Sequence, residues 1–199
     1  MKLYFSPGAC SLATRISLRE AGIPAEFERV DLKSKRTASG ADFDALNPAG
    51  CVPLIVLDDG QSVTENVAIL SLLADTAPQL GVNGQLGRTR LIELLSFLST
   101  ELHIAFKPYF HGATGEELAA ARDAVLRRLN IIARQMRGSY LFGDNFTVAD
   151  AYLFVMLRWA RNHDIELPPR IADLFDIISA RQAVRQSIDE EEGVLVSAS

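Results

Sequence analysis

The sequence predicts an α/β domain followed by an all-helical domain. Strand and helix signals alternate up to about residue 76, and only helical patterns follow residue 87. The stretch between them is rich in Gly, Pro and Asn, which end regular structure. We therefore expect one domain over residues 1–77, a linker over 78–86, and an all-helical domain over 87–199.

The first domain is expected to run in the order β-α-β, β-β-α, which is typical of a thioredoxin-like half-domain. Turn residues punctuate the chain: Gly22 and Pro24 end the first helix, and Asp58-Asp-Gly60 is a strong hairpin turn. The expected strands are 2–5, 27–32, 54–57 and 62–64, and the expected helices start near residue 10 or 11 and at residue 65. Residues 33–44 are expected to be irregular.

Helical periodicity dominates the second domain. Leucines recur at helix spacing from Leu91 to Leu102, and a second amphipathic pattern covers residues 116–137. Thr147 and Asp150 form a capping box that opens a third helix. The acidic run over residues 189–192 is expected to be a solvated tail.

Composition narrows the class of function. The chain is 48% hydrophobic and 23% charged, which is typical of a globular protein. Its net charge of −5 argues against nucleic acid as a partner, and it has neither a signal peptide nor a membrane span. We expect a cytoplasmic protein with two reduced cysteines. Its histidines lack partners at metal spacing, so we expect no metal.

Two nearby features predict a clamp for a small anionic peptide. Val52-Pro53 opens an apolar run, and proline is tolerated at the first residue of a strand. The helix expected at Glu65 exposes backbone N–H groups, which attract carboxylates.

Cys10 lies at the expected start of the first helix, where the helix dipole can lower the pKa of a thiol. A small buried residue at a tight helix start is the alternative interpretation. Ser11 could bond a ligand's sulfur or simply cap the helix. Leu12 and Ala13 follow, so there is no Cys-x-x-Cys motif.

Taken together, these segments resemble the glutathione transferase family. The resemblance rests on Ser6-Pro-Gly-Ala-Cys-Ser11, on Ala49-Gly-Cys-Val-Pro53 and on Thr64-Glu-Asn-Val-Ala-Ile69. It is strongest to the bacterial beta class, which carries a cysteine at the place of Cys10. It implies the glutathione transferase fold, glutathione as co-substrate, a small hydrophobic electrophile as second substrate, and a homodimer.

The resemblance also assigns roles to residues of this chain. Cys10, Ser11 and His103 would be catalytic, with His103 beside the cysteine. The glutathione site would comprise Lys35, Cys51, Val52, Pro53, Glu65 and Asn66, with a cis peptide bond before Pro53. Glu65 would take the ammonium, Asn66 the γ-glutamyl carboxylate, and Lys35 the glycine carboxylate.

The chain departs from the family pattern at several of these places. Cys51 stands where glutamine is usual, Asn66 where serine is frequent, and Ile104 where a lysine commonly follows the histidine. The electrophile is expected against Phe106, Lys107, Tyr109 and Phe110, although core packing explains the aromatic residues equally well.

Two other functions stay open at this point. Cys10 could act as a covalent nucleophile in a thiol-disulfide or peroxidase reaction. Alternatively, the chain could be a non-catalytic binding protein that reuses a transferase-like fold, because a fold alone does not establish function.

Overall fold

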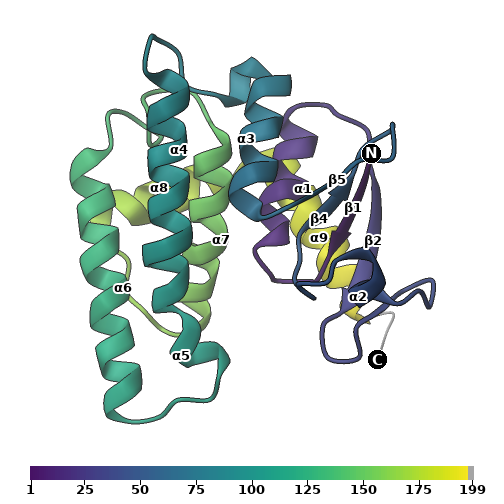
Figure 1. Cartoon of the computed structure of the whole chain (residues 1–199). Coiled ribbons are helices and arrows are strands. Elements are labelled where there is room, and N and C mark those ends of the chain that lie inside the picture. Colours follow the sequence, from purple (N-terminus) through teal and green to yellow (C-terminus); the bar gives the residue numbers. More distant parts are fainter. Residues whose placement is uncertain (197–199) are drawn as a thin grey trace.

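A five-stranded mixed sheet forms the first part of the chain, with strand order β3-β2-β1-β4-β5 (Figure 1). The computed structural model describes residues 1–196. The strands are β1 (Lys2–Phe5), β2 (Glu26–Asp31), β3 (Arg36–Thr37), β4 (Leu54–Val56) and β5 (Ser62–Thr64). β1 runs parallel to β2 and antiparallel to β4, which gives the predicted thioredoxin-like arrangement. Three helices belong to this part: α1 (Ser11–Glu20), α2 (Phe43–Leu46) and α3 (Asn66–Thr76).

One stretch of this part differs from the sequence-based expectation. Residues 33–44 were expected to be irregular, but β3 forms there, with Arg36 paired to Asp31 and Thr37 to Val30. The pairing gives backbone hydrogen-bond partners to the outer side of β2. The expected linker contains a short 3₁₀ helix, η1 (Pro78–Leu80).

Helices build the rest of the chain and cover α1 and α3 on the side away from the sheet (Figure 1). They are α4 (Gly87–Phe97), η2 (Leu98–His103), α5 (Lys107–Phe110), α6 (Glu116–Gln135), α7 (Val148–Asn162), α8 (Pro169–Ser179) and α9 (Gln182–Val196). α7 is buried along most of its length and packs against α1, α3, α4 and α8. None of the helices within residues 1–196 combines the length and the apolar character that crossing a membrane requires.

The leucine-rich helix departs from regular α geometry. Its last six residues, η2, form a π-helical turn, which inserts one extra residue per turn. Leu98 and Leu102 stay buried in the core, while Ser99 and His103 face a cavity. A helix prediction from the spacing of apolar residues assumes 3.6 residues per turn, so it does not detect a π-helical turn.

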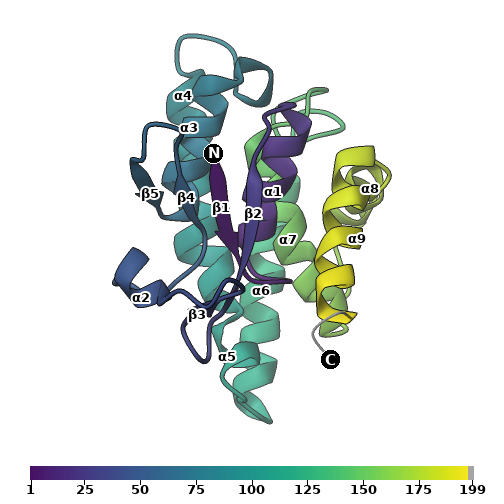
Figure 2. The ribbon, with the colours of Figure 1, turned by 90° about the vertical axis from the view of Figure 1, so that its right-hand side faces the viewer.

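The prediction of a solvated acidic tail is wrong. Residues 189–192 belong to α9, which runs beside α1 (Figure 2). Glu191 is only 3% exposed, and its carboxylate faces the buried guanidinium of Arg15 on α1. A buried arginine needs an opposite charge nearby, and this run supplies it.

The predicted capping box is confirmed at the start of α7. The fully buried Asp150 carboxylate accepts hydrogen bonds from the Thr147 backbone N–H at 2.8 Å and the Leu141 N–H at 3.0 Å. These bonds satisfy buried backbone donors where the loop enters the central helix.

Replacing Asp150 with Ala should therefore strongly destabilise the protein. The change leaves buried N–H donors of Thr147 and Leu141 without acceptors, at a cost of about 3 kcal/mol. Urea unfolding measures the loss. Asp123→Ala, at an exposed position of α6, is the matched control and should change the free energy of unfolding by less than about 0.5 kcal/mol. Equal midpoints for the two variants would contradict the role of the capping box.

Candidate active site

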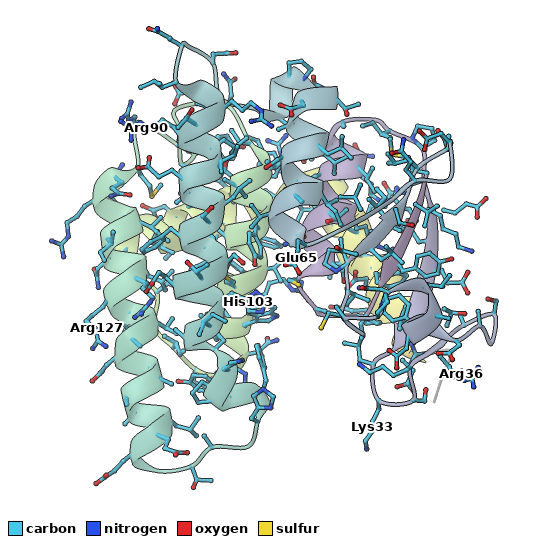
Figure 3. The ribbon with its side chains drawn as sticks, in the orientation of Figure 1. Lys33, Arg36, Glu65, Arg90, His103 and Arg127 are labelled. Carbon is cyan, nitrogen blue, oxygen red and sulfur yellow. The ribbon has the colours of Figure 1, made fainter. Side chains whose placement is uncertain are left out.

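A cavity of about 630 Å³ opens between the two parts of the chain, and both contribute to its walls. Figure 3 shows Glu65 and His103 near each other at this junction. The lining residues are Ser6, Pro7, Gly8, Ala9, Cys10, Leu32, Lys35, Asn47, Ala49, Gly50, Cys51, Val52, Pro53, Thr64, Glu65, Asn66, Ser99, His103, Phe110, Tyr152 and Trp159. The cavity therefore brings together Cys10, His103 and all six residues expected to bind glutathione.

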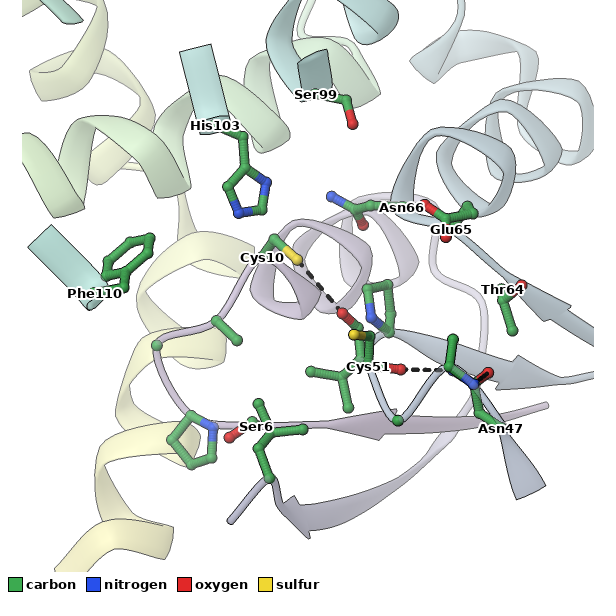
Figure 4. Close-up of a pocket in the computed structure, with 18 of the residues that line it drawn as sticks. Ser6, Cys10, Asn47, Cys51, Thr64, Glu65, Asn66, Ser99, His103 and Phe110 are labelled. Atoms are coloured by element: carbon green, nitrogen blue, oxygen red, sulfur yellow. Dashed lines mark hydrogen bonds between the residues drawn. The ribbon is translucent and has the colours of Figure 1, made fainter. Parts of the chain in front are cut away.

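Cys10 sits at the N-cap of α1, and its thiol donates a hydrogen bond to the Val52 carbonyl at 3.6 Å (Figure 4). Burial raises the pKa of Cys10 to about 12, and the nearby Cys51 and Glu65 add to the rise. Backbone N–H groups of the helix start act in the other direction but are outweighed. The expected lowering of this pKa is therefore wrong, because desolvation exceeds the effect of the helix start.

The loop before β4 is fixed by two side chains. The Val52-Pro53 peptide bond is cis, which confirms the expectation for this position. Asn47 donates from Nδ2 to the Cys51 carbonyl at 2.7 Å, and Lys35 donates from Nζ to the Gly50 carbonyl at 2.7 Å. The Cys51 side chain is exposed at the cavity.

The start of α3 supplies a strained residue and a polar group without a partner. Glu65 has φ 66° and ψ 120°, an unusual conformation for a residue other than glycine. Asn66 is 6% exposed, and its Oδ1 accepts a hydrogen bond from the Thr14 hydroxyl at 3.1 Å. Its Nδ2 is buried on the His103 side of the residue (Figure 4), near the Tyr152 hydroxyl, and makes no hydrogen bond of good geometry within residues 1–196.

His103 enters the cavity from η2. Its Nδ1 lies 2.9 Å from the Tyr152 hydroxyl, and its ring centroid is 4.9 Å from that of Trp159. Burial lowers the pKa of His103, which favours the neutral imidazole. In Figure 4 the ring lies above Cys10, whose sulfur points away from it toward the Val52 carbonyl.

Four predicted residues do not line the cavity. Ser11 is buried, and its hydroxyl bonds the backbone N–H and carbonyl of Ser6 at 3.3 Å, so it stabilises the turn. Phe106 is 1% exposed and packs against Trp159. Lys107 lies outside the lining, and Tyr109 packs against His163 with ring centroids 4.5 Å apart.

Of the predicted aromatic wall, only Phe110 reaches the cavity. The alternative interpretation, packing, holds for Phe106 and Tyr109, which lie after η2, at or beyond the break in the helix. The sequence analysis also missed Asn47 and Tyr152. Asn47 precedes a proline, which signals only a turn, and Tyr152 lies in a helix whose apolar pattern indicates core.

Metal chemistry finds no support in the part of the chain that the structure describes. No group of three or more His, Cys, Asp and Glu side chains is placed there to hold a metal ion.

Comparison with known proteins agrees with a chain made of a thioredoxin-like part and a helical part. A family model of the glutathione S-transferase N-terminal domain matches residues 7–76, and one of the C-terminal domain matches residues 97–182. The chain belongs to the glutathione S-transferase family. The predicted transferase fold is thereby confirmed, with its thioredoxin-like and helical parts.

Several bacterial glutathione S-transferases align with nearly the whole of this chain. Glutathione S-transferase GstA of Escherichia coli O157:H7 is 39% identical, over 96% of this chain and 98% of GstA. The beta class glutathione S-transferase of Sphingomonas chungbukensis is 40% identical with a TM-score of 0.87, over 96% of this chain and 98% of that one. A sphingomonad glutathione S-transferase complexed with glutathione is 39% identical with a TM-score of 0.87, over 96% and 99%. The resemblance to the beta class is confirmed.

The raised pKa of Cys10 leads to a prediction about its reactivity. In a Cys51→Ser protein, alkylation of Cys10 by iodoacetamide should accelerate about tenfold per pH unit from pH 7 to pH 10, because only the thiolate reacts. Mass spectrometry follows the modification, and the variant lacking both cysteines is the control. A plateau below pH 8 would show that the site stabilises the thiolate.

Proposed function

We propose that the protein is a glutathione transferase that conjugates glutathione to small apolar electrophiles. The observation that carries this proposal is the cavity that brings together Cys10, the cis Val52-Pro53 loop and the start of α3. The backbone N–H groups at the start of α3 would attract an anionic ligand there. The glutathione complex of the sphingomonad relative supports glutathione as that ligand.

Each charged group of glutathione would meet a group of opposite charge or a hydrogen-bond donor along the cavity. The γ-glutamyl carboxylate would accept hydrogen bonds from Asn66 and from the backbone at the start of α3, and Glu65 would bind the ammonium. The backbone of Val52 would pair with the cysteinyl unit like an added strand. Lys35 would leave the Gly50 carbonyl and bind the glycine carboxylate.

The site can bring a thiolate and an electrophile together without a metal. A neutral His103, held by the Tyr152 hydroxyl, can take the proton of the glutathione thiol. The resulting sulfur attacks the electrophilic carbon, a thioether bond forms, and the leaving group departs with its electron pair. Cys10, kept as a thiol, can donate a hydrogen bond to that sulfur.

The second substrate would bind at the apolar side of the cavity. Phe110 is 47% exposed and meets Trp159 edge to face at 5.0 Å between ring centroids, and Leu32 lines the cavity with them. The exposed ring of Phe110, with the buried Trp159 behind it, favours a flat apolar electrophile. Phe106 and Tyr109 would act indirectly, by packing behind these rings.

The proposal also covers location, assembly and domain organisation. We infer a cytoplasmic homodimer, as the family resemblance implies. We likewise infer domains over residues 1–77 and 87–199, joined by the linker at 78–86. The family matches to residues 7–76 and 97–182 support this division.

A second candidate function uses Cys10 as a covalent nucleophile in disulfide exchange. Two cysteines, Cys10 and Cys51, line the same cavity, which favours it. The Cys10 thiolate would attack a glutathione mixed disulfide, form a bond to the glutathione sulfur and release the other thiolate. The raised pKa of Cys10 opposes this route, because the thiol is a poor nucleophile.

Asn66→Ala should weaken glutathione binding roughly tenfold, or about 1.4 kcal/mol, because one hydrogen bond to a carboxylate is lost. Titration calorimetry on reduced protein measures it. Asn66→Ser, which keeps a donor, should stay nearer to wild type, and Ser71→Ala on the same helix should match wild type. If the wild-type protein binds no glutathione at millimolar concentration, the transferase proposal fails and a non-catalytic binding role takes its place.

Cys10→Ala separates conjugation from disulfide exchange. Conjugation of a chlorodinitrobenzene should lose no more than about tenfold in kcat/KM, because the variant removes only one hydrogen bond to the sulfur, and a thiol is a weak donor. Reduction of a glutathione mixed disulfide should disappear. Complete loss of conjugation would instead show that Cys10 takes part covalently or as a thiolate.

A further inference from the structure

The peptide groups around Gly8 are held from both sides by residues of the helical part. The Gly8 N–H donates to Glu191 Oε2 at 2.8 Å, and the Gly8 carbonyl accepts from Trp159 Nε1 at 2.8 Å. Gly8 lines the cavity two residues before Cys10. Two residues far along the chain therefore fix the loop between β1 and α1 that forms this wall.

Glu191 itself lies beside a buried positive charge. Its Oε1 lies 3.6 Å from Arg15 Nε, and both side chains are buried. The Arg15 guanidinium is sandwiched between the rings of Phe5 and Phe27, 4.1 Å from each centroid. The carboxylate that meets Gly8 thus belongs to a packed cluster between β1, β2, α1 and α9.

The loop has little else to define its shape. Gly8 has φ +73°, a conformation that glycine adopts without strain. Within the loop, the Ala9 N–H bonds the Ser6 carbonyl at 3.1 Å, and the Ser11 hydroxyl bonds Ser6. These bonds close the turn, whereas the bonds to Glu191 and Trp159 attach it to the helical part.

We propose that Glu191 is a positioning residue: its ionised carboxylate holds Gly8, and through it the Cys10 loop, in the shape that binds glutathione. The statement about glutathione rests on the proposed function, but the statement about the loop does not. Glu191 would thereby link the end of α9 to the catalytic cavity.

Protonation near neutral pH should modulate this link. Burial raises the pKa of Glu191 to about 7, while the Gly8 N–H, Arg15 on α1 and Arg158 on α7 lower it in part. Because the Gly8 bond favours the ionised form, it is stronger to the carboxylate than to the neutral acid. Glu190, the neighbour on α9, is paired with Arg15 and Arg19. The bond to Gly8 should therefore strengthen as pH rises through 7.

Hydrogen exchange at the Gly8 amide, followed by NMR at pH 6 and pH 8, tests the proposal. After correction for intrinsic exchange, wild-type protection should rise with pH. In Glu191→Ala, protection should fall at least tenfold. In Glu191→Gln, which keeps an acceptor but cannot ionise, protection should not change with pH. Asp189→Asn, at an exposed position of α9, is the matched control and should behave like wild type.

The outcomes separate this proposal from the proposed function. Unchanged protection in Glu191→Ala, or a pH-dependent rise that persists in Glu191→Gln, would overturn the role of Glu191. If Glu191→Ala does not fold, the Glu191→Gln comparison still decides. Glutathione affinity, by calorimetry at pH 8, should fall several-fold in Glu191→Gln and not in Asp189→Asn. If the wild type binds no glutathione, only the transferase proposal fails, because exchange at Gly8 needs no ligand.

Discussion

The packing of α1 between the sheet and α7 is the constraint on which the rest of the structure depends. Residues 11–18 of α1 are all buried, because the helix meets the strands on one side and α7, α3 and α9 on the others. One continuous apolar core therefore joins the two parts of the chain. Cys10 begins this helix, so the thiol necessarily lies at the junction where both parts meet.

Buried polar groups beneath the cavity are arranged in pairs. Thr14 on α1 bonds Asn66 on α3, and Tyr152 on α7 bonds His103 on η2. Each pair joins elements that are distant in sequence, so the polar groups also fix how the helices meet. Asn66 Nδ2 lies near the Tyr152 hydroxyl and brings the two pairs together. The same contacts thus stabilise the junction and position His103 and Asn66 at the cavity wall.

Local signals predicted much of this molecule, and long-range contacts explain the rest. The hairpin of β4 and β5, the capping box at Thr147 and the strand entry at Pro53 depend on neighbouring residues, so sequence alone suffices. Glu191 seemed part of a solvated charge run because its partner, Arg15, is far away in sequence. Phe106, Lys107 and Tyr109 were predicted beside Phe110 as electrophile-site residues, but the π-helical turn η2 and the break in the helix after it leave only Phe110 of the four at the cavity. Neither the pairing of Glu191 with Arg15 nor the π-helical turn changes the spacing of apolar residues along the sequence, so neither can be predicted from it.

The raised pKa of Cys10 would make it easier for the thiol of a bound ligand to ionise beside it. Two thiolates at neighbouring positions repel each other, and in a desolvated cavity that repulsion is strong. A site that keeps Cys10 protonated leaves the negative charge to the ligand's sulfur and supplies a donor to stabilise it. The neutral His103 beside it can then accept a proton. Under the proposed function, the burial that makes Cys10 a poor nucleophile would leave the glutathione sulfur as the group that ionises and attacks.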